Sequence, residues 1–449
     1  MGSISFSETP LSGDAAVAFN TKSAPPHNTA APLSVEALQL KLNQAVTGFI
    51  SKNPSSWIAS QRAQKGLPSG TTRAVLAVNP FPLIVKSGHG ATLTSLDDDT
   101  YIDFQSDYTA GLFGHSHPDI KAAIVQATNG GFNLGAVTTL EAELGESIKA
   151  RFPSIDTIRF CNSGTEANMY AIAAALAYTG RKKILIFDSG YHGGSLSFSE
   201  GVNPLNIPHD YVLGAYNDIE KTRSVLSGEI GVIVVEPMQS AGGMRPADEE
   251  FLRYLRRAAD VLGCLLIFDE VVTSRLDYGG LQGRYQIFPD ITTLGKYLGG
   301  GLPFGAFGGK KQIMEQFDPT SGAATKLFHS GTFNNNTFTM SAGVAAAKIV
   351  TKEAIERTNA LGDRVRRGIN EMAADRRDRI VAIGIGSCVG IRFLEGTTSP
   401  VLKELLFFHM ISHGFWIGRR GFVSLSFANT QEHVDRFLDA FRNFLQLYM

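Results

Sequence analysis

The chain is poor in cysteine and has almost no net charge. Only three of its 449 residues are cysteines, and its formal net charge is −1. Cys161, Cys264 and Cys388 lie far apart in apolar or glycine-rich sequence, so we expect neither a disulfide framework nor a metal site. Because positive charge is not in excess, binding to nucleic acid or to an anionic membrane surface is not expected either.

Long apolar runs are also missing. No stretch approaches the ~18 consecutive apolar residues of a membrane span. The N-terminal residues lack a positively charged region followed by an apolar one, so we expect no secretory signal, and Glu8 and Asp14 without any Arg argue against a mitochondrial presequence. Apolar residues are nevertheless abundant, at 43% against 18% charged residues, which is typical of a globular protein with a large core. We predict a cytoplasmic protein.

Four regions follow one another along the chain. Residues 1–33 are rich in Ser, Thr, Ala and Pro, which indicates a mobile tail or a strap over a partner subunit. A helix is expected to begin after Ser34, and short alternating segments up to Phe104 predict a meander. We therefore predict an N-terminal helix and meander at 34–105 that contribute to a small domain, a large domain at 106–340 and the rest of the small domain at 341–449.

The middle of the chain alternates between strands and helices. Apolar runs that are continuous rather than alternating predict strands at 158–161, 184–187, 232–235, 265–268 and 291–293. This α/β order predicts a mainly parallel sheet covered by helices, and such sheets bind ligands at the carboxyl ends of their strands. Past residue 340, a long helix is expected to lead into a smaller α+β unit.

Polar residues follow the first of these strands, where a helix is expected to begin. Ser163, Gly164 and Thr165 offer hydroxyl and backbone N–H groups at a helix N-terminus, which stabilises an anion. An ordinary Ser or Thr N-cap, with Glu166 in the first turn, uses the same residue types. Both interpretations stay open on this segment alone.

The next two strands are followed by an aromatic residue and by a carboxylate. Tyr191 and His192 stand among glycines, where an aromatic ring can lie flat against a planar ligand; a simple loop anchor is the alternative. Glu236 ends the third apolar strand. A carboxylate at that position needs a partner or a function, unless it is a solvated loop residue.

Asp269 and Lys296 carry the most specific signal. Asp269 terminates a fully apolar strand and needs a positive partner; a protonated pyridine nitrogen would serve, and a helix cap or a salt bridge is the alternative. Val271, two residues on, points to the same side and could pack on that ring. Lys296 lies in a glycine-rich turn, where burial would lower the pKa of its ammonium group and leave an amine that forms an imine with a carbonyl.

In this order the residues form the parts of a pyridoxal-phosphate site: a phosphate cradle, a stacking aromatic ring, an acid for the ring nitrogen and a lysine. The sequence resembles the class III aminotransferases over about residues 50–430. The resemblance implies the fold-type I architecture, with a mainly parallel seven-stranded sheet covered by helices and a smaller α+β domain. It is carried by Asn-Ser-Gly-Thr-Glu-Ala-Asn (162–168), Tyr-His-Gly (191–193), Val-Glu-Pro (235–237), Phe-Asp-Glu-Val (268–271) and Leu-Gly-Lys (294–296).

Within that class the sequence is similar to the β-phenylalanine aminotransferases and to the glutamate-1-semialdehyde aminomutases. The resemblance implies pyridoxal 5'-phosphate as cofactor and a homodimer with active sites at its interface, where Thr332 of one subunit contacts the cofactor phosphate of the other. Lys296, Asp269 and Tyr191 are expected to be catalytic. The predicted cofactor-binding residues are Ser163, Gly164, Thr165, Tyr191, His192, Glu236, Asp269, Val271, Lys296 and Thr332.

Two arginines are predicted to bind the substrate. Arg73 precedes an apolar run and Arg420 precedes a strand of the C-terminal unit. The resemblance makes both candidates for substrate carboxylates, which a guanidinium binds bidentately; surface arginines are the alternative. Gly418 and Arg419 stand before Arg420 where other residues are expected in the relatives, so Arg419 could share the role.

We predict an aminotransferase that moves an amino group from an amino acid to a 2-oxo acid such as 2-oxoglutarate or pyruvate. The favoured donor is a β-amino acid with an aromatic or apolar side chain, and Lys296 is expected to act as general base. An intramolecular aminomutase, or racemisation or decarboxylation on the same cofactor, would use the same residues. A non-catalytic cofactor-binding protein is disfavoured, because Lys296 and Asp269 serve chemistry more than affinity.

Overall fold

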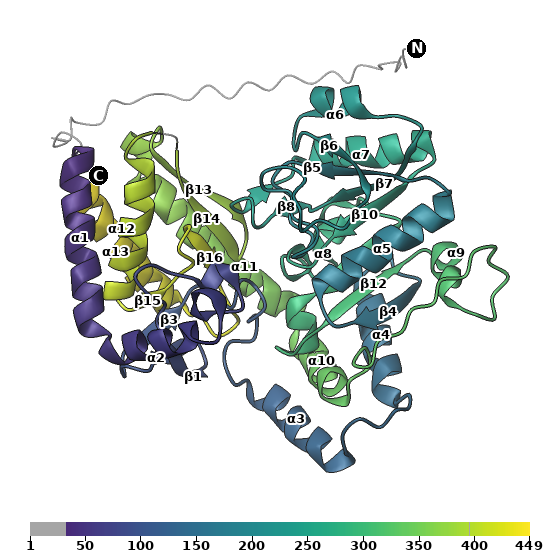
Figure 1. The fold of residues 1–449 in the computed structure, drawn as a ribbon, viewed down its shortest axis with the longest axis horizontal. Helices are drawn as coiled ribbons and strands as arrows, with labels where there is room; N and C mark the ends of the chain where they lie inside the picture. Colours follow the sequence, from purple (N-terminus) through teal and green to yellow (C-terminus); the bar gives the residue numbers. More distant parts are fainter. Residues whose placement is uncertain (1–32, 395) are drawn as a thin grey trace.

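The computed structural model describes residues 33–394 and 396–449. Figure 1 shows a larger part built around a central sheet and a smaller part in which α1, α12 and α13 lie side by side. The predicted tail, residues 1–33, lies outside the described residues except for Leu33. In the described ranges no helix is long and apolar enough to cross a membrane.

A seven-stranded sheet forms the centre of the larger part, in the order β4-β12-β11-β10-β7-β5-β6. Neighbouring strands are parallel except at β12, which runs antiparallel to both β11 and β4. This sheet confirms the predicted α/β fold class. Its strands are β4 (Thr157–Cys161), β5 (Lys183–Phe187), β6 (Asp210–Gly214), β7 (Ile230–Val235), β10 (Leu265–Asp269), β11 (Ile291–Gly295) and β12 (Gly305–Gly309).

The sequence analysis found five of these strands, each to within two residues of its bounds, and missed β6 and β12. β12 is mostly glycine because its neighbours approach closely. A Cβ on Gly305 would lie 2.1 Å from the backbone oxygen of Ser163, and one on Gly309 would lie 2.2 Å from that of Asp290. Because β12 needs glycine at these positions, it has few of the β-branched and aromatic residues by which a strand is predicted from sequence.

Helices cover both faces of the sheet. Along β10, Leu265 and Ile267 face the core beneath α5 (Gly164–Thr179), whereas Leu266 and Phe268 face the core beneath α7 (Glu249–Leu262). Burial on both faces explains why the strands read as continuous apolar runs. The larger part also contains α3 (Pro118–Gly130), α4 (Thr139–Arg151), α6 (Ile219–Val225), α8 (Gly280–Tyr285), α9 (Lys311–Met314), α10 (Thr337–Ile349), the β8 (Met238–Gln239) and β9 (Arg245–Pro246) pair, η3 (Thr273–Arg275), η4 (Lys296–Gly299) and η5 (Glu315–Phe317).

The smaller part combines both ends of the described chain. One sheet has the order β1-β2-β3-β15 and another the order β13-β14-β16. The elements are α1 (Val35–Lys52), α2 (Pro54–Gln64), η1 (Pro68–Gly70), η2 (Ala74–Leu76), β1 (Val85–His89), β2 (Thr92–Ser95), β3 (Thr100–Asp103), α11 (Lys352–Met372), η6 (Ala374–Arg376), β13 (Ile380–Ile385), β14 (Cys388–Phe393), α12 (Ser399–Ser412), β15 (Phe415–Trp416), β16 (Phe422–Ser424) and α13 (Gln431–Tyr448).

Ser34 caps α1, as expected, and accepts a hydrogen bond from the Ala37 amide at 3.2 Å. The long helix expected past residue 340 is instead two helices, α10 and α11. The helix is interrupted between α10 and α11 because Thr351 is the N-cap of α11. The Thr351 hydroxyl accepts a hydrogen bond from the Ala354 amide at 3.2 Å. One hydrophobic core joins residues 38–104 to residues 365–445, and three others gather residues within 112–355. These cores support the predicted division into domains, which stays a proposal.

Candidate active site

The predicted phosphate cradle lies where β4 meets α5. Ser163 is the N-cap of α5, and its hydroxyl accepts from the Glu166 amide at 3.1 Å. The loop after β5 closes over this helix start: a Cβ on Gly193 would lie 2.3 Å from the Thr165 hydroxyl, and the Gly194 amide donates to that hydroxyl at 3.3 Å. The residues form a normal N-cap, and Ser163, Gly164 and Thr165 remain partly exposed, so the two sequence interpretations are compatible.

Asp269 ends β10 and is almost completely buried, with 4% of its surface exposed. One carboxylate oxygen, Oδ2, accepts from Asn168 Nδ2 at 2.9 Å and from His192 Nδ1 at 2.8 Å. The other, Oδ1, accepts from the Val271 amide at 3.1 Å. The sequence analysis expected a positive partner and named a protonated pyridine nitrogen, with a helix cap or a salt bridge as the alternative. The structure supplies His192, which the sequence analysis had considered only beside Tyr191.

His192 and Glu236 form a buried polar group behind Asp269. Burial alone would lower the pKa of His192, but the hydrogen bond and charge of Asp269 outweigh it and raise that pKa. Glu236 accepts from the Tyr191 amide at 2.9 Å and from the Ser240 amide at 3.2 Å. Burial raises its pKa to about 7. Glu236 is therefore not the solvated loop residue that the sequence left open.

Val271 packs directly against two glycines of the site. A Cβ on Gly164 would lie 3.0 Å from the Val271 side chain, and one on Gly295 would lie 3.3 Å from it. Tyr191, on the loop fixed by Glu236, leaves 45% of its surface exposed. Val271 therefore contacts the glycines at the cradle, as its spacing from Asp269 predicts, and Tyr191 is free to stack on a ligand.

Lys296 follows β11 and begins η4. Its backbone is in the left-handed region, with φ of 56°, and its Nζ donates to the backbone oxygen of Tyr108 at 3.0 Å. Burial lowers the pKa of its ammonium group. The side chain is thus held at a defined place and biased toward the neutral amine, as the sequence analysis expected of an imine-forming lysine.

The acceptor of that hydrogen bond lies in a turn that the sequence analysis did not find. Ser106, Asp107, Tyr108 and Thr109 have φ of 48°, 44°, 50° and 79°. Four consecutive left-handed residues other than glycine are costly, at about 1–2 kcal/mol each. No glycine or proline signals such a turn in this segment, so only the three-dimensional structure reveals it.

The two predicted substrate arginines flank this turn. Arg73 donates to Asp107 at 2.6 Å, and its guanidinium lies 5.7 Å from the centre of the Tyr108 ring. Arg420 is exposed, and its charge acts on the Tyr108 hydroxyl together with that of Arg73. Arg419 instead forms a bidentate ion pair with Glu404, with Nε 2.8 Å from Oε2. The contacts favour Arg420 over Arg419 for a ligand.

Thr332 lies apart from these residues in an exposed segment of the same chain. Asn334, two residues on, accepts from Asn162 Nδ2 at 2.9 Å and so joins the segment to the end of β4. Asn335 donates to Glu141 at 2.8 Å. The structure thus fixes the segment beside the sheet but leaves Thr332 itself facing outward.

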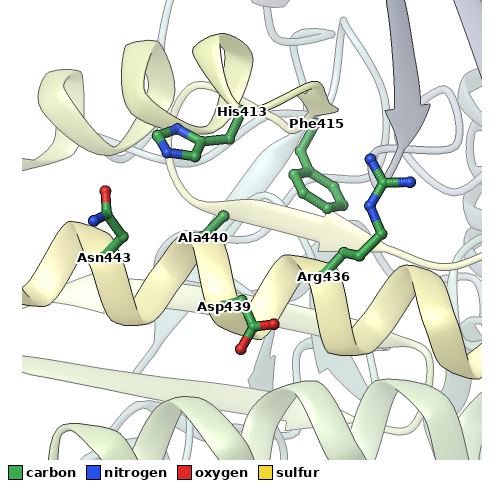
Figure 2. A pocket seen from close by; sticks show the side chains of 6 residues that line it. All are labelled: His413, Phe415, Arg436, Asp439, Ala440 and Asn443. Carbon is green, nitrogen blue, oxygen red and sulfur yellow. The ribbon is translucent and has the colours of Figure 1, made fainter.

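A separate hollow of about 290 Å³ lies in the smaller part. Figure 2 shows that Ala440, Asn443, Arg436 and Asp439 come from one helix, with His413 and Phe415 on the opposite wall. None of the predicted site residues lines it. The hollow is open and mostly apolar, and it contains none of the chemistry described above.

A family model, aminotransferase class-III, matches residues 74–445. The chain belongs to the class III aminotransferases. It is 42% identical over 422 residues to the β-phenylalanine transaminase of Variovorax paradoxus, covering 91% of this chain and 96% of that one. A crystal structure of the β-phenylalanine aminotransferase from Variovorax paradoxus matches with a TM-score of 0.88, covering 91% of this chain and 98% of that one, at 41% identity.

Two further relatives support the same placement. The glutamate-1-semialdehyde 2,1-aminomutase of Methanococcoides burtonii is 34% identical over 409 residues, covering 85% of this chain and 96% of that one. A transaminase solved with PLP bound matches with a TM-score of 0.82 at 30% identity, covering 88% of this chain and 97% of that one. The protein is therefore a transaminase that depends on pyridoxal phosphate (PLP), and the predicted family, enzyme class and cofactor are confirmed.

The residues of this class III aminotransferase fit the cofactor. Gly164 and Gly295 lie so close to Val271 that an added Cβ on either would crowd it, so these two positions present backbone rather than side chains beside Val271. The Asp269 carboxylate retains acceptor capacity beyond its three donors, because each oxygen can accept more than one hydrogen bond. A phosphate would meet the N-terminus of α5, a ring nitrogen would meet Asp269, and an aldehyde would meet Lys296.

Asn168 is the cofactor-site residue that the sequence analysis missed. It is buried on α5 and bridges two strands, since its Nδ2 donates to Asp269 and its Oδ1 accepts from the Thr293 hydroxyl at 2.8 Å. A sequence signal existed: Asn168 is a polar residue on an otherwise apolar stretch of helix, one turn past the cradle. A buried amide there needs several partners.

Proposed function

We propose that this class III aminotransferase transfers the amino group of an aromatic or apolar β-amino acid to a 2-oxo acid. The observation that carries the transaminase part is the placement of Lys296, a buried amine of lowered pKa in the same site as an anchored Asp269. The β-amino acid part is supported by the similarity to the β-phenylalanine transaminase and by the two arginines beside the Tyr108 turn.

Each residue has a defined task in this proposal. The bound cofactor supplies an electron-withdrawing ring that accepts the charge left when a proton leaves the substrate carbon. Asp269 carries the negative charge that keeps a ring nitrogen protonated, and Asn168 and His192 hold its carboxylate in place. Lys296 Nζ takes up the proton and returns it. Ser163, Gly164 and Thr165 bind the phosphate, and Tyr191 and Val271 enclose the ring.

The substrate carboxylate is proposed to bind Arg73, Arg420 or both. A β-amino acid places its amine one carbon further from the carboxylate than an α-amino acid does. Two arginines that reach the site from different elements suit such a substrate. Either arginine can bind the substrate carboxylate, while the opposite side of the site accepts the substrate side chain. Asp107 orients the Arg73 guanidinium at 2.6 Å in the absence of substrate.

A homodimer completes the proposed site. Thr332 faces outward from this chain and is proposed to bind the cofactor phosphate of the partner subunit. Exposed apolar side chains surround it: Phe328 is 94% exposed and Val137 is 84% exposed. The segments that carry them are joined, since Phe132 packs on Phe338 with ring centres 5.0 Å apart. Exposed apolar side chains that gather in one region mark protein–protein interaction sites.

The experiment that tests the function is an amine-transfer assay. The purified protein is mixed with β-phenylalanine and either 2-oxoglutarate or pyruvate, and amination of the acceptor is followed. We expect acceptor amination together with loss of the donor amine. Lys296→Ala is the control, and it should lose both turnover and the visible absorbance of the lysine–cofactor linkage. Turnover that survives in Lys296→Ala would contradict the proposed role of this lysine.

Two further experiments test the aminomutase alternative and the carboxylate-binding arginines. Isomerisation of an amino-aldehyde substrate without any acceptor amination would favour the aminomutase, to which the chain is also similar. For the carboxylate, Arg73→Ala and Arg420→Ala should each raise KM by roughly tenfold or more, as expected for a lost charge-assisted pair. Arg419→Ala is the matched control, because Glu404 already occupies Arg419; an equal rise there would mean that the Arg420 effect is not specific.

A further inference from the structure

Arg275 is a buried cation without a carboxylate partner. It is the last residue of η3, and only 1% of its surface is exposed. Among residues 33–394 and 396–449, it forms no ion pair with Asp or Glu, and burial lowers the pKa of its guanidinium. A buried charge left in this state is costly, so a residue that is merely structural has little reason to be arginine here.

The Arg275 guanidinium donates hydrogen bonds to two other segments, the turn of residues 106–109 and the end of β16. Nη1 donates to the Thr109 oxygen at 3.1 Å and to the Ser424 hydroxyl at 2.9 Å, and Nη2 donates to the Leu425 oxygen. The Ser106 hydroxyl in turn donates to the Ser424 oxygen at 2.9 Å. The turn of residues 106–109 is therefore fastened to the end of β16 at both of its ends, and Arg275 forms one of the two fastenings.

This left-handed turn carries two groups of the proposed active site. The Tyr108 oxygen accepts from Lys296 Nζ at 3.0 Å, and the Asp107 carboxylate pairs with Arg73 at 2.6 Å. A strained turn of this kind persists only where its surroundings over-determine it. If the turn relaxed, the lysine would lose its acceptor and the arginine would lose its orienting carboxylate at the same time.

We propose that Arg275 is a positioning residue that holds the left-handed turn of residues 106–109 against β16, and that its unpaired charge also acts on Lys296. The proposal rests on the proposed role of Lys296. It explains why the cation is left without a counter-ion: a carboxylate beside Arg275 would compete with the backbone oxygens for its N–H groups and would cancel its charge.

Geometry supports the second half, because Lys296 Nζ and Arg275 Nη1 donate to the backbone oxygens of two adjacent residues, Tyr108 and Thr109, at 3.0 and 3.1 Å. The charges around Lys296 agree with this arrangement. Burial is the main cause that lowers the pKa of Lys296; Asp107 and Asp269 raise that pKa, and Arg73 and Arg275 lower it. Cys388 and Tyr297 are the titratable groups that face Arg275 itself. Removal of the Arg275 charge therefore favours the protonated lysine.

The first test measures the turn directly in the holoenzyme. The Ala110 and Gly111 amides donate to the Asp107 and Ser106 oxygens at 3.1 and 2.8 Å, so their hydrogen exchange reports whether the turn is closed. In Arg275→Met we expect exchange at these two amides to rise about tenfold, with α5 amides unchanged, and kcat to fall about tenfold or more. Arg275→Lys should restore part of both.

The second test compares the two variants by pH titration of the visible absorbance of the holoenzyme. This absorbance reports the proton on the nitrogen that links Lys296 to the cofactor, and a nearby positive charge opposes that proton as it opposes the proton on the free amine. Both variants weaken the hold on the turn, but only the methionine removes the charge. The midpoint in Arg275→Met should therefore lie above that in Arg275→Lys, by about one pH unit. Equal midpoints would overturn the action of the charge on Lys296, and wild-type exchange at Ala110 and Gly111 in Arg275→Met would overturn the positioning role.

A milder variant keeps the proposal testable if Arg275→Met does not fold. Ser106→Ala removes the other fastening and leaves Arg275 in place. It should speed exchange at the same two amides by a smaller factor and lower kcat, whereas unchanged exchange and kcat would show that fastening the turn to β16 is unimportant and would overturn the proposal. Failure of the proposed function itself is recognised separately, through Lys296→Ala in the transfer assay.

Discussion

Glu236 is a buried carboxyl group that lowers the stability of the folded protein when it is ionised. Its carboxylate is buried, and it receives the Tyr191 and Ser240 amides rather than a direct ion pair. The nearby His192 charge opposes the rise in its pKa, but burial is the larger effect. The Glu236 side chain therefore fixes the start of the aromatic loop at the expense of stability whenever it is ionised.

This cost makes stability depend on pH. The pKa of Glu236 is about 7 in the folded protein against a usual value of 4.5. Because the folded value is the higher one, the contribution of Glu236 is present below pH 4.5 and is lost as the pH rises through about 7. The Glu236→Gln variant has no carboxyl group to titrate at this position. The free energy of unfolding that the wild type loses through ionisation of Glu236 is roughly 3 kcal/mol at most.

We therefore expect Glu236→Gln to gain stability relative to the wild type as the pH rises. The melting temperatures of both proteins, measured between about pH 5 and pH 8, should diverge in favour of the variant toward the alkaline end. A constant difference over this range would mean that Glu236 ionises normally in the folded protein.

At the scale of elements, the site depends on how closely the loop after β5 approaches the start of α5. Gly193 has φ of 123°, and no Cβ fits between it and Thr165. This approach brings the loop amides and the helix N-terminus to one place, where a phosphate is proposed to bind. Two elements from different βα units would thus form the proposed phosphate site together.

Gly193→Ala should disrupt this approach. Its Cβ would lie 2.3 Å from the Thr165 hydroxyl, and its backbone would be strained as well. We expect PLP affinity to fall by roughly tenfold or more, measured by equilibrium titration of the apoenzyme. Gly194→Ala is the matched control, because no atom lies within 4 Å of its added Cβ. Equal losses in the two variants would contradict the explanation from crowding.

At the scale of the whole molecule, one surface of the larger part is unusually apolar. The loop between α3 and α4 exposes Phe132, Leu134 and Val137, and the segment before α10 exposes Phe328 and Phe333. In Figure 1 these helices lie near one another at the lower side of the larger part. Because Thr332 lies within the same segment, an interface here would deliver it to a second subunit.

Replacing Val137 and Phe333 by Asp should therefore separate the proposed dimer. Burial of unpaired carboxylates would oppose association, so we expect a monomer in sedimentation analysis, with activity and PLP affinity both reduced. Val261→Asp is the control, since Val261 is 61% exposed on α7, away from this surface. A wild-type protein that is monomeric and fully active would contradict the proposal.

The sequence predicted the residues whose neighbours along the chain are informative. Asp269 and Lys296 stand out because each follows an apolar strand, and the five strands were found because burial on both faces removes polar residues from them. The left-handed turn and Arg275 could not be found in this way. Their partners are remote, such as Thr109 for Arg275, and no local pattern encodes a buried guanidinium that binds backbone oxygens.

β12 escaped prediction for another reason, and Thr332 was predicted only from the resemblance to a family. β12 is shaped by contacts with Ser163 and Asp290 that exclude side chains, so its sequence resembles a loop. The role proposed for Thr332 involves a second subunit, which no local pattern in the sequence of one chain can indicate. Residues with chemical roles at strand ends are therefore the easiest part of the site to predict from sequence. The contacts by which distant segments position these residues are the hardest.

The pairing of β15 with β3 has a consequence for biosynthesis. Phe415 pairs with Ile102, and the Phe104 amide donates to the Trp416 oxygen at 2.8 Å. The sheet of the N-terminal meander thus lacks its fourth strand until the last part of the chain is made, whereas the fully buried residues of the three cores within 112–355 are all made before β15. On the ribosome, the cofactor cradle can mature before Arg420 emerges. A chain interrupted after α10 would have its PLP residues but would lack the arginine from the C-terminal end.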